Sequence, residues 1–167
     1  MRKQASSPVL VDHLNIRMFT YPLAKQVLLV LLGVLDLSIA AKIKIPMWPV
    51  PITMGTFAVL SIGAAYGARL GIITILSYLL IGALGLDVFA GSSSENFGLS
   101  YMLGGTGGYL FGYILAVCAL GLLAQMGWDR SSIWLACALF IGNVLIYIPG
   151  LIWLGLLYGW DKPIFSW

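Results

Sequence analysis

The segment Met47-Trp48-Pro49-Val50-Pro51-Ile52-Thr53-Met54-Gly55-Thr56-Phe57-Ala58-Val59-Leu60 passes from a proline-rich stretch directly into an apolar helical pattern. Together with Pro46, its two prolines place three imino acids within six residues. Proline has no amide donor and pushes the residue before it into an extended conformation. Non-helical backbone at membrane depth is tolerated only where protein buries it or where it lines a cavity. The segment therefore predicts a ligand site held between transmembrane helices.

The composition of the whole chain is that of a membrane protein. Of its 167 residues, 60% are hydrophobic and only 9% are charged, whereas about 25% of the residues of a soluble domain are charged. We therefore predict an all-α polytopic membrane protein, a compact bundle of about five transmembrane helices, because about 20 apolar residues cross a bilayer. The predicted spans are Leu23–Ala41, Thr53–Tyr66, Leu70–Leu86, Thr106–Met126 and Ile133–Leu157.

These spans divide the chain into three parts. We expect a cytoplasmic N-terminal segment at 1–21, a transmembrane domain at 22–158 and a short tail at 159–167. The two long connections, 43–52 and 87–105, then lie on the same side of the membrane.

The distribution of basic residues predicts the orientation of the bundle. With a cytoplasmic N-terminus, six basic residues face the cytoplasm and three face outward, which agrees with the positive-inside rule. The inner set is Arg2, Lys3, Arg17, Lys25, Arg69 and Arg130, and the outer set is Lys42, Lys44 and Lys162. We therefore expect a multi-pass protein of the cytoplasmic membrane with both long connections external, where an importer first meets its ligand.

A glycine-rich turn precedes the fourth predicted span, in Gly104-Gly105-Thr106-Gly107-Gly108-Tyr109. Thr106 can cap this helix, and free amides at a helix N-terminus favour an anion such as a carboxylate. Small residues also let membrane helices pack closely. The pattern leaves both interpretations open for Gly107 and Gly108.

The second connection and the first span add further candidates. Asn96 offers donors and acceptors that suit an amide or urea group, although the loop around it could be a simple solvated connection. Asp36 is an acid inside a span, and such residues face a partner or a cavity or reach the headgroups. The aromatic residues Trp48, Phe89 and Tyr101 either belong to the interfacial belt or form the wall of a pocket.

Several function classes find no support in the sequence. We find no HExxH, GxSxG or phosphate-cradling GxxxxGK[ST] motif, and Cys118, Cys137 and His13 form no metal or redox spacing. We expect no catalytic residue, no metal and no cofactor, so any ATP-driven step belongs to a partner. The basic residues form no patch, so we expect no nucleic acid partner.

Motifs in several parts of the chain resemble those of one family. Pro49-Val50-Pro51-Ile52-Thr53 followed by Thr56-Phe57-Ala58-Val59-Leu60 resembles the opening signature of the BioY family, the biotin-specific substrate-binding (S) components of energy-coupling factor (ECF) importers. The resemblance continues in the same order through about residues 25–160, in the segments 63–71, 81–86, 88–91, 104–109 and 147–154.

The resemblance implies a membrane bundle that holds one biotin near the external face. It implies contacts from Asn96, from Thr53 with the first-loop segment around Trp48, and from Tyr109 with its glycines. It also implies a transmembrane coupling protein and cytoplasmic ATPases as partners. Small residues of the first helix form the partner contact in this family, and the candidates here are Ala24, Gly33, Ala40 and Ala41.

The chain departs from the family pattern at a few positions. Gly55 stands where glutamine is common, and Asp87 and Gly105 stand where proline is common. Leu110 stands where some members have arginine after the turn tyrosine. The family has six helices, and we expect the sixth, with its pocket-lining charges, to be missing from this sequence. Alternatives to a biotin-binding S component are a decayed or structural membrane subunit, an S component for another vitamin, and a transporter that works without an ATPase.

Overall fold

The computed structural model describes residues 22–46, 50–91 and 97–160. Trp48 and Asn96, both predicted to contact ligand, lie outside the described residues. The elements are α2 (Pro22–Lys42), β1 (Lys44–Ile45), β2 (Ile52–Thr53), α3 (Gly55–Ala83), α4 (Gly98–Leu103), α5 (Gly107–Gln125), η1 (Trp128–Arg130) and α6 (Ser132–Tyr158).

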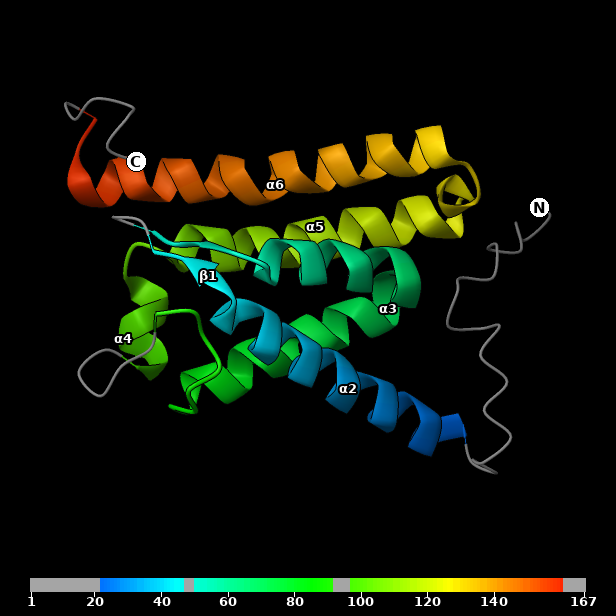
Figure 1. Ribbon diagram of the computed structural model, residues 1–167, viewed down its shortest axis with the longest axis horizontal. Coiled ribbons are helices and arrows are strands. Elements are labelled where there is room, and N and C mark those ends of the chain that lie inside the picture. The colour runs from blue at the N-terminus through cyan, green and yellow to red at the C-terminus, as the bar shows by residue number, and fades with distance from the viewer. Residues whose placement is uncertain (1–21, 47–49, 92–96, 161–167) are drawn as a thin grey trace, which may run out of the picture.

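Helix α3 doubles back on itself in the middle. Gly67 interrupts it with φ 74° and ψ 174°, a backbone conformation that glycine adopts without steric cost. The two legs of α3 run in opposite directions from this residue (Figure 1). This turn falls in the gap between the second and third predicted spans, and the five apolar spans correspond to α2, the two legs of α3, α5 and α6. The prediction of an all-α polytopic membrane fold is confirmed.

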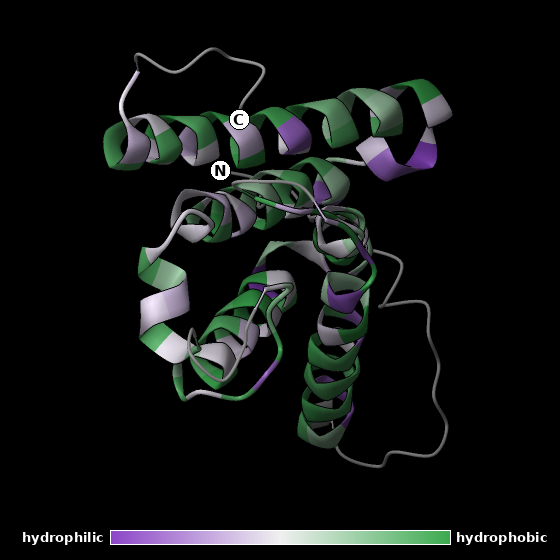
Figure 2. Ribbon diagram, turned by 60° about the vertical axis from the view of Figure 1, so that its left-hand side comes forward, coloured by the Kyte–Doolittle hydropathy of each residue, from purple (hydrophilic) through white to green (hydrophobic). Residues whose placement is uncertain are grey.

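The helices pack side by side and expose apolar side chains on their outer surfaces. Helix α3 contacts α2 and α5, and α5 contacts α6. Val59, Ile75 and Val117 are fully buried between them, whereas Ile133 is 76% exposed and Phe140 is 70% exposed. Hydrophobic residues predominate along the long helices in the view of Figure 2. Such a surface is stable in a lipid environment, where exposed leucine and isoleucine carry no hydration cost.

Polar side chains inside the helices find local partners. The Thr74 hydroxyl, which is fully buried, donates to the Leu70 carbonyl at 2.9 Å. The Asn143 amide donates to the Leu139 carbonyl at 3.1 Å. Each bond runs back one helical turn, a pattern that satisfies a polar group in a helix without help from a neighbour.

Both long connections contain regular structure that we did not predict. In the first, β1 and β2 pair antiparallel, with Lys44 opposite Thr53 and Ile45 opposite Ile52. Thr53 therefore lies in a strand, and α3 begins later, at Gly55. In the second, α4 forms a short helix. These elements gather at the end of the bundle where α2 ends and α5 begins (Figure 1).

The small residues of α2 face the interior of the bundle. A Cβ at Gly33 would lie 2.6 Å from the Thr74 methyl carbon, and Ala40 and Ala41 are buried. In this arrangement all three residues are therefore buried within the chain, and their contact with a partner stays a prediction. Ala24 is partly exposed at the start of α2, and its contact stays a prediction.

Close backbone approach at α5 generates a prediction about stability. A Cβ at Gly121 would lie 2.1 Å from the Ala68 backbone nitrogen, so Gly121→Ala forces α5 away from the turn of α3. We expect a loss of about 1–3 kcal/mol, the usual cost of overpacking, measured as a lower melting temperature in detergent. Gly105→Ala is the matched control, because its Cβ would meet no atom closer than 3.4 Å. Equal stability of the two variants would contradict the close approach.

Candidate ligand-binding site

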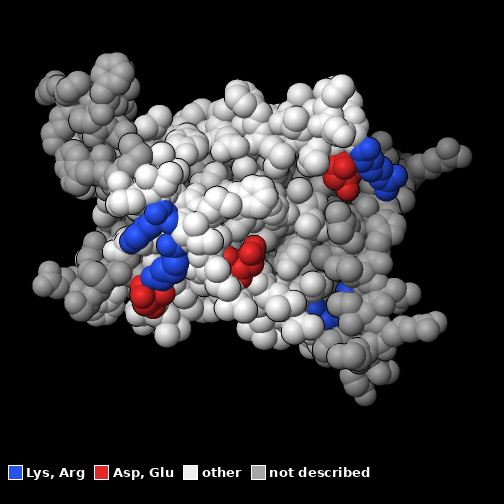
Figure 3. All heavy atoms as spheres, viewed as in Figure 1, with Lys and Arg blue, Asp and Glu red and all other residues white. Residues whose placement is uncertain are grey.

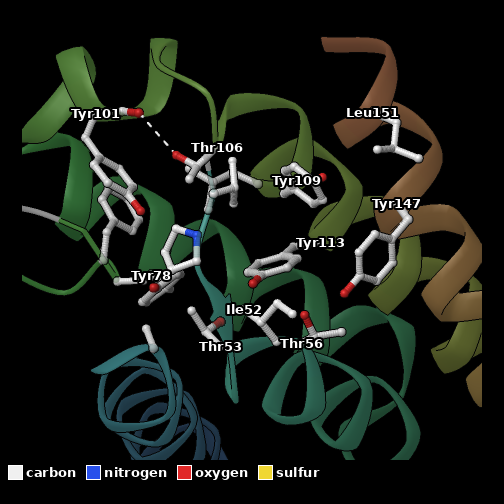
Figure 4. A pocket seen from close by; sticks show the side chains of 16 residues that line it. Ile52, Thr53, Thr56, Tyr78, Tyr101, Thr106, Tyr109, Tyr113, Tyr147 and Leu151 are labelled. Atoms are coloured by element: carbon white, nitrogen blue, oxygen red, sulfur yellow. Dashed lines mark hydrogen bonds between the residues drawn. The ribbon is translucent and has the colours of Figure 1, made fainter. Parts of the chain in front are cut away.

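A cavity of about 210 Å³ lies at the end of the bundle that holds the β1–β2 hairpin and α4. Helices α2, α3, α5 and α6, strand β2 and the segment that follows α3 all contribute to its wall (Figure 4). The lining residues are Ala41, Val50, Pro51, Ile52, Thr53, Thr56, Tyr78, Phe89, Ala90, Tyr101, Thr106, Tyr109, Leu110, Tyr113, Tyr147 and Leu151.

Hydroxyl groups supply the polar character of this wall. Five tyrosines and three threonines are among the lining residues, which include no charged side chain. Tyr113 lies with its phenol beside the hydroxyls of Thr53 and Thr56 (Figure 4). Hydroxyls both donate and accept hydrogen bonds. The cavity therefore suits a neutral ligand portion that has both donors and acceptors and a flat or apolar body.

Phe89 anchors the loop side of the wall. Its ring is 1% exposed, stacks on Tyr101 at a centroid distance of 5.1 Å and meets Tyr78 edge-on at 5.4 Å. Gly82 makes room for it, because a Cβ there would lie 2.1 Å from the ring of Phe89. A residue in an irregular segment is thus fixed as firmly as a residue of the helical core.

Hydrogen bonds attach the two connections to this aromatic group. The Tyr78 hydroxyl donates to the Val88 carbonyl at 3.1 Å, and the Tyr101 hydroxyl accepts from the Gly91 amide at 3.2 Å. The Thr106 hydroxyl donates to the Tyr101 carbonyl at 3.3 Å (Figure 4). Burial raises the pKa of Tyr101 by more than the hydrogen bonds with Thr106 and Gly91 lower it. The phenol therefore stays neutral at pH 7.

The structure brings four of the predicted ligand residues together. Four predicted residues line the cavity, although each comes from a different part of the chain. Thr53 comes from β2, Phe89 from the segment after α3, Tyr101 from α4 and Tyr109 from α5. Tyr109 also meets Tyr147 of α6 edge-on at 5.7 Å. Their role in binding stays a prediction, since the arrangement places the side chains without identifying the ligand.

Other predicted residues lie away from the cavity wall. A Cβ at Gly107 would lie 2.3 Å from the Met102 carbonyl oxygen, and one at Gly108 would lie 2.4 Å from the Pro149 carbonyl oxygen. Both glycines are therefore closely packed, and a contact of their amides with an anion stays a prediction. Thr106 occupies the cap position of α5, but its side chain makes no capping bond. Asp36 is exposed on α2 and does not line the cavity.

The sequence reasoning missed several lining residues, among them Thr56, Tyr78, Tyr113 and Tyr147. All four lie inside long apolar helices, where a tyrosine or threonine does not stand out from the residues that face lipid. Tyr113 follows Tyr109 by four residues, which places both on the same face of a helix. That spacing was a usable signal in the sequence. Among the described residues, no group of three His, Cys, Asp or Glu side chains could hold a metal ion.

Known proteins resemble this chain in sequence. The BioY family model matches residues 5–166. A probable biotin transporter BioY of Rickettsia prowazekii is 31% identical over 157 residues, which cover 93% of this chain and 76% of that protein. Another probable biotin transporter BioY, from Pyrococcus horikoshii, is 37% identical over 139 residues, covering 83% of this chain and 80% of the relative.

A solved structure resembles the fold. The crystal structure of the S-component for biotin from an ECF-type ABC transporter superposes with a TM-score of 0.71 at 24% identity, over 84% of this chain and 76% of the other. The apolar helices and the sequence matches agree on a multi-pass membrane protein. This chain belongs to the BioY family.

Proposed function

We propose that this chain binds biotin in the cavity and serves as the substrate-binding component of an ECF-type importer in the cytoplasmic membrane. The observation that carries the proposal is a neutral, aromatic and hydroxyl-lined cavity at one end of a BioY-family membrane bundle. The named relatives and the solved biotin S-component support the choice of biotin as ligand.

The chemistry of biotin matches that of the wall. Its ureido ring needs paired donors and acceptors, which the hydroxyls of Thr53, Thr56 and Tyr113 can supply. Its thiophane ring is apolar and fits against Phe89 and the tyrosine rings. Asn96 adds an amide from the second connection, as the family resemblance implies, and this role stays a proposal because Asn96 lies outside the described residues.

The positions of the charged residues support an outward-facing cavity. Arg69 follows the turn at Gly67, and Arg130 lies in η1. The turn of α3 and the end of α5, next to which these residues lie, are at the end of the bundle opposite β1 and α4 (Figure 1). Excess basic residues mark the cytoplasmic side. The N-terminus is therefore cytoplasmic in our proposal, and the cavity opens toward the external face, where an importer meets its ligand.

The proposed partners are a transmembrane coupling protein and cytoplasmic ATPases. The chain has no phosphate-cradling motif of its own, so the energy for transport comes from those subunits. Gly33, Ala40 and Ala41 are buried in this arrangement, whereas Ala24 is partly exposed, so Ala24 is the one of the four candidates that a coupling protein reaches without a rearrangement of α2.

The first prediction concerns the ligand itself. Membranes that contain the full chain should bind radiolabelled biotin saturably, and an excess of unlabelled biotin should displace it. Riboflavin and thiamine should not compete, since neither carries the fused ureido and thiophane rings of biotin. Binding of riboflavin or thiamine in place of biotin would identify an S component for another vitamin, and binding of none would favour a structural subunit.

The second prediction concerns the hydroxyls of the wall. Thr56→Val removes one hydroxyl beside Tyr113 at nearly constant volume, so we expect biotin affinity to fall about three- to tenfold, the effect of one hydrogen bond. Thr74→Val is the matched control: the same change in the same helix, at a buried hydroxyl that bonds to Leu70. The control should lower stability and leave biotin affinity unchanged. Unchanged affinity in Thr56→Val would exclude a contact with the ligand.

The third prediction concerns the amide of the second connection. If Asn96 binds the ureido group, Asn96→Ala should weaken biotin binding at least tenfold, because a polar ligand group then loses its partner on burial. Asn143→Ala removes an amide that bonds within α6 and should keep normal affinity. Equal binding by both variants would show that the asparagine carried over from the family has no contact here.

A further inference from the structure

Two lysines lie at the edge of the cavity, close together in sequence. Lys42 ends α2 and Lys44 begins β1. The Lys42 Nζ lies 2.5 Å from an Asp87 carboxylate oxygen and donates to the Phe89 carbonyl at 2.9 Å. The Lys44 Nζ donates to the Ala90 carbonyl at 2.5 Å. Figure 3 shows basic and acidic side chains gathered at this end of the molecule.

The local charges do not cancel within the described part of the chain. Lys42 forms an ion pair with Asp87. Lys44 instead donates to the carbonyl oxygen of Ala90, which carries no charge. An ammonium group has three donors, so this bond leaves Lys44 with capacity for a second acceptor. Among the described residues, the edge of the cavity thus carries surplus positive charge, next to lining residues that include no charged side chain.

The position of Lys44 relative to the cavity is fixed from two sides. In the β1–β2 ladder Lys44 lies opposite Thr53, and its ammonium bonds to Ala90. Both of these partners line the cavity. Lys44 itself is exposed and is not among the lining residues. It therefore lies at the rim, where it meets the part of a ligand that extends beyond the neutral wall.

We propose that Lys44 recognises the carboxylate tail of the ligand and makes the site selective for the charged acid over a neutral analogue. This inference rests on the proposed function. The neutral ring enters the hydroxyl-lined cavity, and the carboxylate stays at the rim beside the ammonium. A charge-assisted hydrogen bond is stronger than a neutral one, and salt weakens it because the lysine is exposed.

A purely structural role for Lys44 makes a different prediction. If the lysine only fastens the loop through Ala90, its removal weakens binding of charged and neutral ligands to the same extent. If it recognises the carboxylate, its removal changes the ratio of the two affinities. The ratio therefore separates recognition of the tail from maintenance of the cavity.

The experiment measures displacement of radiolabelled biotin by biotin and by biotin amide, on membranes containing the full chain. We expect the wild type to favour biotin over the amide about three- to fivefold, as for an exposed ion pair, and less so at 0.5 M than at about 0.05 M salt. Lys44→Gln should abolish this preference and its salt dependence, and Lys44→Arg should retain both. Lys25→Gln, which removes a charge from the other end of α2, should behave like the wild type.

Two results would overturn the inference. If both affinities in Lys44→Gln equal those of the wild type, the lysine does not recognise the carboxylate. If both fall by the same factor, the ratio is again unchanged and the lysine only holds the loop in place. Failure of the wild type to bind biotin at all is a different outcome. It would refute the proposed function, and the inference about the tail with it.

Discussion

The packing of Phe89 is the contact on which the ligand site depends. Phe89 lies in an irregular segment, yet its ring is buried against Tyr78 of α3 and Tyr101 of α4. This arrangement requires Gly82, since any side chain there would overlap the ring. One aromatic residue thus joins the end of α3 to the second connection. Without it, neither Ala90 nor Tyr101 would hold its place in the wall.

The same kind of constraint governs the helices beneath the cavity. Helices in lipid gain nothing from hiding apolar surface, so they associate through close van der Waals contact. Glycines provide that contact here: a Cβ at Gly112 would lie 2.7 Å from the Cα of Ile146. Gly108 has the same role nearer the cavity, against Pro149 and Trp153. These two glycines of α5 therefore fix where Tyr109 and Tyr113 lie relative to α6.

Much of the fold could be predicted from the sequence, because crossing a membrane requires long apolar segments whatever the tertiary contacts. The spans follow from composition, the gap between the second and third spans marks the turn at Gly67, and the family motif points to Thr53. For Phe89 and Tyr101 the sequence left an interfacial position open, and only the structure places them in the cavity wall. The direction of the small residues on α2 could not be predicted, since spacing alone does not say which face of a helix meets protein. Gly33 faces inward because it packs against Thr74 of α3. Ala41 faces inward because it lines the cavity.

Tyr113 and Tyr147 show the other limit of the sequence. A tyrosine in an apolar helix has the same local pattern whether it faces lipid or a cavity, and only the packing of α5 between α3 and α6 decides between them.

Contacts of different kinds hold the two sides of the cavity wall in place. On the helical side, contacts between backbones hold the tyrosines in position, and they are insensitive to salt. On the loop side, Lys42 and Lys44 bind carboxylate and carbonyl oxygens while exposed to solvent, and such contacts contribute at most about 1 kcal/mol each. The loop side therefore depends on the buried ring of Phe89, stacked on Tyr101, more than on its lysine contacts to keep its place in the wall.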